Sequence, residues 1–354
     1  MTSAQRYRFW LIGLVVALAL LYVLRGMLLP FVAGMAIAYF LDPLADRLER
    51  SGLSRLAATS VITASFFLLV VLAMIILLPI IENQVVAFAQ KVPGYIDTLN
   101  QRLQPLLAEI KERLSPRDIE KLRSSAGEYA GTAMSWAVGA IRGVLSGSLA
   151  VFNVLSLVFI TPVVTFYLLR DWDAMVRKVD SWLPRHHADT IREQMEEINR
   201  TLSGFVRGQA LVCLSLGLIY GVGLTLVGLD LGLVIGMGAG VLSFIPYLGS
   251  ITGFVVGMGV ALAQGPDWHL PAMVAGVFVV GQVIEGNFLT PKLVGDKVGL
   301  HPVWVMFALL AFATLFGFVG LLLAVPVAAV IGVLVRFALG RYLSSPLYHG
   351  HRPQ

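Results

Sequence analysis

The chain has 354 residues, of which 57% are hydrophobic and only 13% carry a charge. A soluble domain has about 25% charged residues, so this composition excludes an ordinary water-soluble protein and predicts an all-α, polytopic membrane protein. The net charge of +5 comes mostly from Lys and Arg beside apolar segments, which favours membrane lipid over nucleic acid as a partner. The single cysteine, Cys213, excludes an internal disulfide.

Residues 1–81 are predicted to hold the first membrane segments. Two short apolar runs, 9–24 and 27–41, are separated by Arg25 and Gly26 and suggest a helical hairpin that returns the chain to its starting side. Residues 57–81 form an uncharged apolar run of about 25 residues, enough to cross a hydrocarbon core of about 30 Å. This last run is predicted to be a full membrane span.

Residues 82–142 are polar overall and are predicted to form an extracytoplasmic, amphipathic helical region. One interpretation is a helical hairpin that covers its own core. The other is a self-association seam, because the apolar spacing resembles a heptad, and it predicts a homo-oligomer that crosslinking in membranes could refute. The apolar residues with helical spacing are Ile96, Leu99, Leu103, Leu106, Ile110 and Leu114.

Residues 143–169 are predicted to form a second membrane span, interrupted at Thr161 and Pro162, where the freed backbone can kink the helix. Residues 170–204 mix Arg and Glu, which is typical of a solvated helical pair. His186 and His187 lie in this polar segment, and a solvated position is a better explanation for them than a metal site. We therefore expect neither a metal ion nor a cofactor.

Residues 205–337 are predicted to form a transport core. After one span at 205–227, the apolar segments 231–263 and 303–337 are too long for one span of about 20 residues and too short for two spans of about 40 residues plus a turn. Each fits a re-entrant helical hairpin, with breaks expected at 244–249 and 316–320. The residues predicted at hairpin tips and gates are Pro246, Gly249, Gly317, Gly320 and Pro291.

Lys and Arg in short loops predict which connections face the cytoplasm. The connector 264–269 has none and is expected outside, whereas 290–301 contains Lys292 and Lys297 and is expected inside. In the alternative, residues 231–263 form one long tilted helix kinked at Pro246, which reverses the following span. The segments predicted to be cytoplasmic are the N-terminus, residues 42–56, residues 170–204 and the tail 338–354.

Glu285 is the only acidic residue inside a long apolar segment. Because desolvation disfavours the charged form of a carboxyl, such a residue usually marks a transport path, and it suits proton or cation coupling. Gln282 and Asn287 are expected to face the same region. In the alternative, the Glu285 carboxyl only hydrogen-bonds a hairpin tip. Broken apolar helices beside such a group are the arrangement of secondary transporters.

Four sequence motifs in this order resemble the autoinducer-2 exporter family, also called PerM-type permeases. The resemblance covers most of the chain. It implies a multi-pass bacterial inner-membrane protein with about eight membrane segments, and either export of a quorum-sensing furanone or sodium/proton antiport. The motifs are TPVVTFYLLRDWD at 161–173, GFVRGQ at 204–209, FIPYLG at 244–249 and EGNFLTPKLVGDKVGLHP at 285–302.

An enzyme is not expected, because the sequence lacks a phosphate-binding loop, an H-E-x-x-H motif and a G-x-S-x-G motif. The sequence instead favours a secondary transporter of a small solute, such as a signalling molecule, or of a cation. Three alternatives stay open: a sodium/proton antiporter, a passive channel, and a membrane scaffold whose 82–142 region binds an envelope partner.

Overall fold

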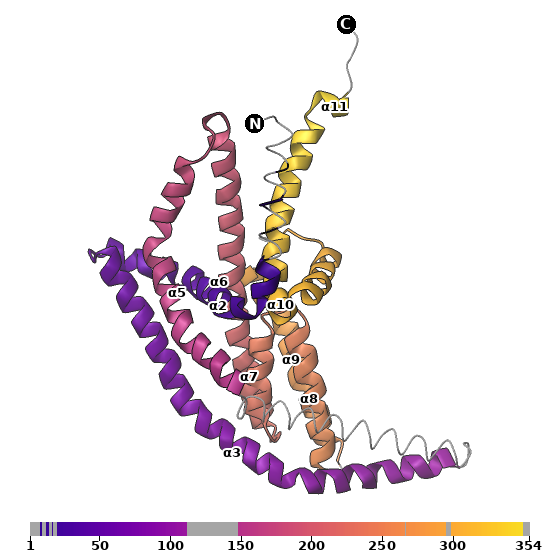
Figure 1. Ribbon diagram of the computed structural model, residues 1–354. Coiled ribbons are helices and arrows are strands. Elements are labelled where there is room, and N and C mark those ends of the chain that lie inside the picture. The colour runs from indigo at the N-terminus through magenta and orange to yellow at the C-terminus, as the bar shows by residue number, and fades with distance from the viewer. Residues whose placement is uncertain are drawn as a thin grey trace. The chain divides into compact units, whose positions relative to one another are not determined.

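The computed structural model describes residues 20–111, 148–265, 267–294 and 299–349, together with Arg8, Ile12, Gly13 and Val16. In these residues the regular structure is entirely helical (Figure 1), which confirms the predicted all-α class. The chain divides into two compact units. Unit 1 comprises Met1–Leu69, Phe159–Val212 and Gly286–Gln354, and unit 2 comprises Val70–Val158 and Cys213–Glu285.

Long helices separated by short turns make up both units. The elements are η1 (Leu24–Met27), α2 (Leu28–Arg50), α3 (Arg55–Lys111), α5 (Ser148–Ser181), η2 (Arg185–His187), α6 (Ala188–Leu226), α7 (Gly232–Leu242), α8 (Leu248–Gln264), α9 (His269–Ile284), η3 (Glu285–Val294), α10 (Pro302–Leu343) and α11 (Pro346–His349).

Among the described residues, five helices are long and apolar enough to cross a membrane, and α7 and α8 are shorter apolar helices. The family-based number of about eight membrane segments stays a prediction, because parts of residues 1–19 and residues 143–147 lie outside the described ranges. The five are Leu28–Arg50, Arg55–Phe88, Arg185–Leu226, His269–Val294 and Pro302–Leu343.

Helix α2 runs on to Arg50, nine residues past the end of the apolar run at residue 41. An ion-pair cluster around Arg55, at the start of α3, lies along this last part of α2. Its guanidinium lies 3.2 Å from Asp42, 2.6 Å from Asp46 and 3.1 Å from Glu49. These carboxylates are three and four residues apart, so a helical backbone puts them on one face.

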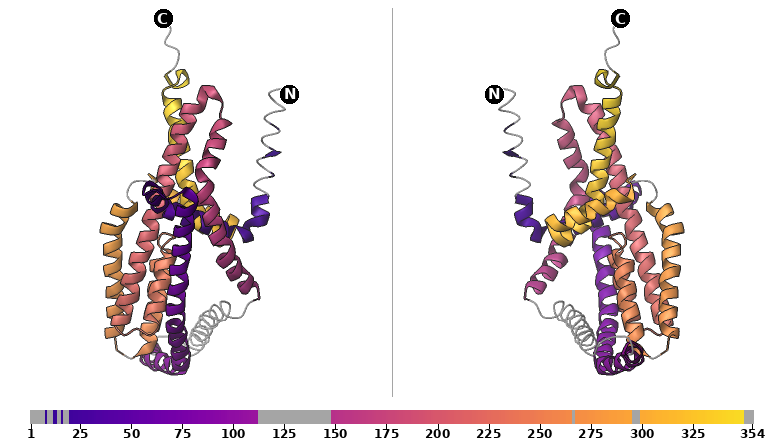
Figure 2. Two further views of the ribbon diagram at one scale, coloured as in Figure 1. Left: turned by 90° about the vertical axis from the view of Figure 1, so that its left-hand side faces the viewer. Right: turned by 90° about the vertical axis from the view of Figure 1, so that its right-hand side faces the viewer.

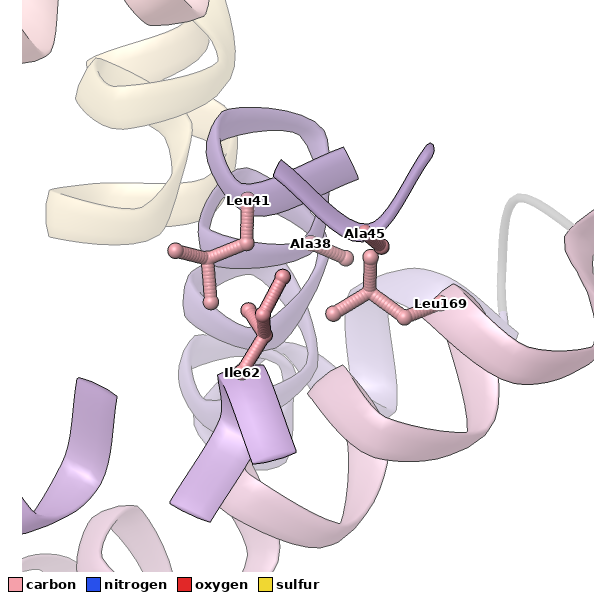
Figure 3. Close-up of a cluster of buried hydrophobic side chains, with 5 residues drawn as sticks. All are labelled: Ala38, Leu41, Ala45, Ile62 and Leu169. Atoms are coloured by element: carbon pink, nitrogen blue, oxygen red, sulfur yellow. The ribbon is translucent and has the colours of Figure 1, made fainter. Parts of the chain in front are cut away.

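Arg55 also joins α5 to this cluster. Its Nε and one terminal nitrogen donate hydrogen bonds to the backbone carbonyl of Leu169, at 3.1 and 2.8 Å. An apolar cluster of unit 1 lies at the same junction, where side chains from α2, α3 and α5 meet (Figure 3). The buried residues of this cluster are Ala38, Leu41, Ala45, Ile62 and Leu169.

Helix α5 stays helical through Pro162, where an interruption was expected. The hydroxyl of Thr165 donates to the carbonyl of Gly34 at 3.2 Å, a bond from α5 to α2. Gly34 permits this approach, because a Cβ at that position would lie 2.7 Å from a methyl group of Val164. The polar residues of this apolar segment therefore serve helix packing in unit 1.

Helix α3 continues without a break past residue 81 to Lys111, so the predicted domain boundary at 81/82 is not an element boundary. Only 6% of its most apolar stretch is buried within the structure, as expected for a surface that faces lipid. The predicted self-association seam rests on side chains between residues 96 and 114 that lie outside those described, so it stays a prediction.

The segment expected to form the first hairpin consists of two helices, α7 and α8, packed against each other in unit 2. The chain breaks at 243–247, close to the expected 244–249, and Tyr247 takes a positive φ of 67° there. The two ends meet: the Asp230 amide donates to Gln264 Oε1 at 2.9 Å, and Gln264 Nε2 donates to the Gly228 carbonyl at 2.8 Å. The chain thus turns back on itself and does not form one long helix.

The second predicted break also falls within its expected stretch of 316–320. Gly317 interrupts α10 with non-helical angles, φ 61° and ψ −136°, which favour glycine. Figure 2 shows the two parts of α10, in orange and in yellow, pointing in different directions. Gly320 packs so closely beside this bend that a Cβ there would clash with the Phe312 carbonyl.

Candidate functional site

Glu285 lies at the junction of α9 and the π-helix η3 and is half-buried. The side-chain amide of Gln282 donates a hydrogen bond to Glu285 Oε2 at 2.6 Å and contacts the hydroxyl of Tyr220 at 3.3 Å. The three-residue spacing of Gln282 and Glu285 puts both side chains on one helical face. Carboxylate, amide and phenol thus form one connected polar group of unit 2, in which the Gln282 side chain is exposed.

Tyr220 comes from α6 and is fully buried. Gly281 of α9 makes room for it, because a Cβ at Gly281 would lie 2.8 Å from the Tyr220 hydroxyl oxygen. Tyr220 was not among the predicted site residues. Its position within an apolar span could have indicated a polar contact there, because a buried phenol needs a hydrogen-bond partner.

The polar group is connected to the α7–α8 pair through aromatic contacts. The Phe278 ring of α9 lies 4.6 Å from the Tyr220 ring and 5.7 Å from the Phe254 ring of α8, measured between centroids. Gly253 of α8 allows this packing, since a Cβ there would lie 3.1 Å from the Phe278 ring. One aromatic side chain, Phe278, thus contacts both Tyr220 of α6 and Phe254 of α8.

The other predicted site residues have different positions. Asn287 is exposed on η3 and belongs to unit 1, so its placement beside Glu285 stays a prediction. Pro246 lies in the turn between α7 and α8, and Gly249 packs against the Ala239 carbonyl and Ser243. Pro291 lines a cavity in unit 1. Gly317 and Gly320 lie at the bend of α10.

In the part of the chain that the structure describes, no group of three or more His, Cys, Asp or Glu residues could hold a metal ion. His186 and His187 lie in the short helix η2 with exposed side chains. The site around Glu285 offers one carboxylate, one amide and one phenol, a set that can bind a proton, a cation or a small polar solute through oxygen atoms.

Residues 11–340 match the family described as AI-2E family transporter. The chain belongs to the AI-2E transporter family. It is 29% identical over 316 residues to a Bacillus subtilis relative named as a transport protein, YrrI, covering 88% of this chain and 87% of the relative. An Escherichia coli relative named as a permease, PerM, is 28% identical over 334 residues, or 92% of this chain and 91% of PerM.

A further relative of this AI-2E family chain comes from Synechocystis and is named as the transport protein sll0063. It is 29% identical over 320 residues, which cover 86% of this chain and 75% of the relative. The family and the apolar helices together indicate a multi-pass membrane protein with a transport function. The resemblance drawn from the four sequence motifs is thereby confirmed.

Proposed function

We propose that this protein is a secondary transporter of the bacterial inner membrane that moves a small solute and couples the movement to a proton or cation at Glu285. The observation that carries the proposal is the chain of contacts from Glu285 through Gln282, Tyr220 and Phe278 to the α7–α8 pair. It connects an ionisable group to a broken apolar helix, which is the combination that secondary transporters use.

In this proposal the α7–α8 pair is a re-entrant hairpin whose second arm, of 17 residues, is longer than its first. Its 11-residue first arm extends about 16 Å, roughly half of a hydrocarbon core of about 30 Å. The hydrogen bonds between Asp230, Gln264 and Gly228 close the base of the pair, so both arms begin on the same side. In this proposal the hairpin tip lies within the membrane and moves during transport.

The Gln282 amide supplies the coupling. It donates to Glu285 while that carboxylate is charged, and a charged acceptor forms a stronger hydrogen bond than a neutral one. Protonation or cation binding at Glu285 therefore weakens its bond to Gln282, whose amide then keeps its contact with the Tyr220 hydroxyl and is available to a polar solute. In the narrower variant, sodium/proton antiport, the Glu285 carboxylate and the Tyr220 hydroxyl supply oxygen ligands to Na⁺.

The first experiment is transport by proteoliposomes that contain a pH-sensitive dye. Wild type, Glu285→Gln and a matched control, Glu193→Gln, receive Na⁺, K⁺ and candidate small solutes in turn. Glu193 is an exposed carboxylate on α6, so its removal tests the loss of a charge at a remote site. We expect Glu285→Gln to slow coupled proton movement by about tenfold or more, and Glu193→Gln to behave as wild type.

The outcomes separate the remaining alternatives. If protons move when Na⁺ alone is supplied, the protein is a sodium/proton antiporter. If protons move when a solute is supplied, the protein exports or takes up that solute. If Glu285→Gln passes the same solute at the wild-type rate with the same proton coupling, the carboxylate is structural and the coupling mechanism is wrong. If wild type moves neither ions nor solutes, a scaffold role replaces the transport proposal.

A further inference from the structure

Unit 1 contains a cavity of about 980 Å³ whose described lining does not include Glu285, Gln282 or Tyr220. It is formed by the first half of α6, by η3, by Gly299 and by Arg336 of α10. This volume is at the upper end of the range for small-molecule sites, roughly 300–1,000 Å³. The cavity is therefore large enough for an organic ligand and not only for a simple ion.

The charge of the cavity is strongly one-sided. Among the described residues, its lining includes four cationic side chains, Arg200, Arg207, Lys292 and Arg336, and one carboxylate, Glu197. Glu197 pairs with Arg200 at 2.5 Å. The other three positive charges therefore face the cavity without a carboxylate from the described part of its lining. Such an excess of positive charge attracts an anion.

The hydrogen bonds of these cations leave donor capacity for a ligand. Arg336 donates from one terminal nitrogen to the Gly299 carbonyl at 3.1 Å. Lys292 has its ammonium group 6.0 Å from the centre of the Phe288 ring. Neither residue forms an ion pair with any carboxylate in the described part of the chain. Arg207 donates from Nε to the Tyr39 carbonyl at 3.0 Å and lies 3.8 Å from Asp42, which compensates only part of its charge.

Close backbone packing holds the cations in place. Gly208 of α6 lies against η3, because a Cβ at that position would be 2.7 Å from the carbonyl carbon of Leu293 and 3.1 Å from the Cα of Val294. This contact brings Lys292 beside the arginines of α6. Gly299 has a φ of 57°, and a Cβ there would be 3.1 Å from the Arg336 guanidinium. The backbone segments that carry the cations are thus closely packed, while the side chains of Arg200, Lys292 and Arg336 are exposed to solvent.

We propose that this cavity binds an organic phosphate, with the phosphate oxygens held by Lys292 and Arg336 and the organic part against Leu211 and Pro291. Guanidinium and ammonium groups are the common protein ligands of phosphate, and the two apolar residues supply a surface for carbon atoms. The phosphate could belong to a soluble phosphate monoester or to the headgroup of an anionic lipid. The proposal goes beyond solute transport and does not depend on coupling at Glu285.

The test for a soluble ligand is isothermal titration of the full chain in neutral detergent with glycerol 3-phosphate and, separately, with inorganic phosphate. We expect Lys292→Gln and Arg336→Gln each to weaken binding about tenfold or more, and Lys292→Arg to retain it. The matched control is Arg177→Gln, which removes an exposed cation of α5 in the same unit. An increase in salt from 0.1 to 0.5 M should also weaken binding.

The test for a lipid ligand uses nanodiscs of phosphatidylcholine with and without phosphatidylglycerol, followed by native mass spectrometry. If wild type retains phosphatidylglycerol and Lys292→Gln loses it, the ligand is a lipid headgroup. If glycerol 3-phosphate binds and phosphatidylglycerol does not inhibit its binding, the ligand is a soluble phosphate ester.

The proposal would be overturned if wild type bound neither glycerol 3-phosphate nor phosphatidylglycerol, or if the Lys292 and Arg336 variants bound them as wild type does. It would also be overturned if Arg177→Gln weakened binding as much as Lys292→Gln and Arg336→Gln. The unfolding temperature of each variant without ligand shows whether a loss of binding reflects a loss of folding, and Lys292→Arg serves as the charge-retaining variant. Because binding is measured without transport, its failure is distinguishable from failure of the transport proposal.

Discussion

Charged side chains of this protein pair near the ends of its apolar helices. Lys91 of α3 binds both carboxylate oxygens of Asp230, just before α7, at 2.9 and 2.8 Å. Arg192 of α6 binds both oxygens of Asp180, near the end of α5, at 2.6 and 2.9 Å. Exposed ion pairs contribute little to global stability, so the effect of these pairs is local. Each pair fixes the position of one segment against another.

The Asp180–Arg192 pair predicts a pH-dependent turn between α5 and α6. The Arg192 guanidinium holds the pKa of the Asp180 carboxyl below its usual range. A lowered pKa in the folded state adds stability that is present above the ordinary aspartate value of about 4 and is lost as pH falls through the lowered value. We therefore expect the turn to open only below about pH 4.

An environment-sensitive dye on His186→Cys, in a Cys213→Ser background, measures this opening as pH falls from 7 to 2. Arg192→Gln should move the midpoint upward, towards the ordinary aspartate value, and Arg177→Gln should leave it unchanged. Equal midpoints in wild type and Arg192→Gln would show that the pair does not control the turn.

At the scale of helices, glycine determines which surfaces can meet. Gly236 and Gly240 of α7 face Gly221 and Gly217 of α6, and a Cβ at either α7 position would clash with α6 backbone. Gly238 lies between them on the same helix, is exposed, and has no atom within 4 Å of a Cβ placed there. The four-residue glycine steps therefore serve close helix packing, as small-residue stripes do in membrane proteins.

Gly236→Ala and Gly238→Ala form a matched pair that tests this packing. We expect Gly236→Ala to destabilise the protein by roughly 1–3 kcal/mol, because the methyl group has no space against the backbone of Gly221. Gly238→Ala should be neutral or stabilising by up to about 1 kcal/mol, since alanine is the better helix former. Thermal unfolding in detergent gives both values. Equal unfolding temperatures for the two variants would contradict close α6–α7 packing.

The turn-back of α7 onto α8 also decides the topology of the whole chain. If both ends of the pair lie on one side, the connector 264–269 stays outside and the lysines after α9 face the cytoplasm, as the positive charges require. If residues 231–263 crossed as one helix, every later segment would be reversed. The hydrogen bonds from Gln264 to Asp230 and Gly228 favour the first arrangement.

Cysteine labelling in spheroplasts tests this topology in a Cys213→Ser background. We expect a membrane-impermeant maleimide to label Asp267→Cys in intact spheroplasts, because the positive charges predict that the connector 264–269 faces outward. Arg185→Cys, in the turn between α5 and α6, should react only after permeabilisation. Labelling of Asp267→Cys only after permeabilisation would support the single tilted helix instead.

Some features of the molecule follow from the sequence because they depend on local composition. Apolar content predicted the all-α membrane class. The lengths of the apolar segments and their glycines predicted two helix breaks, and Pro246 and Gly317 lie at those breaks. The pairing of Gln282 with Glu285 follows from helical spacing, since three residues put both on one face. Four motifs in order were sufficient for the family.

Only the tertiary structure decided the contacts between residues far apart in the sequence. Tyr220 meets Gln282 across 62 positions, and Arg55 of α3 pairs with carboxylates at the end of α2. The basic cavity combines cations from α6, η3 and α10. The local sequence around each of these residues does not reveal these contacts. Periodicity indicates which face of a helix a residue occupies, but not which distant helix packs against that face.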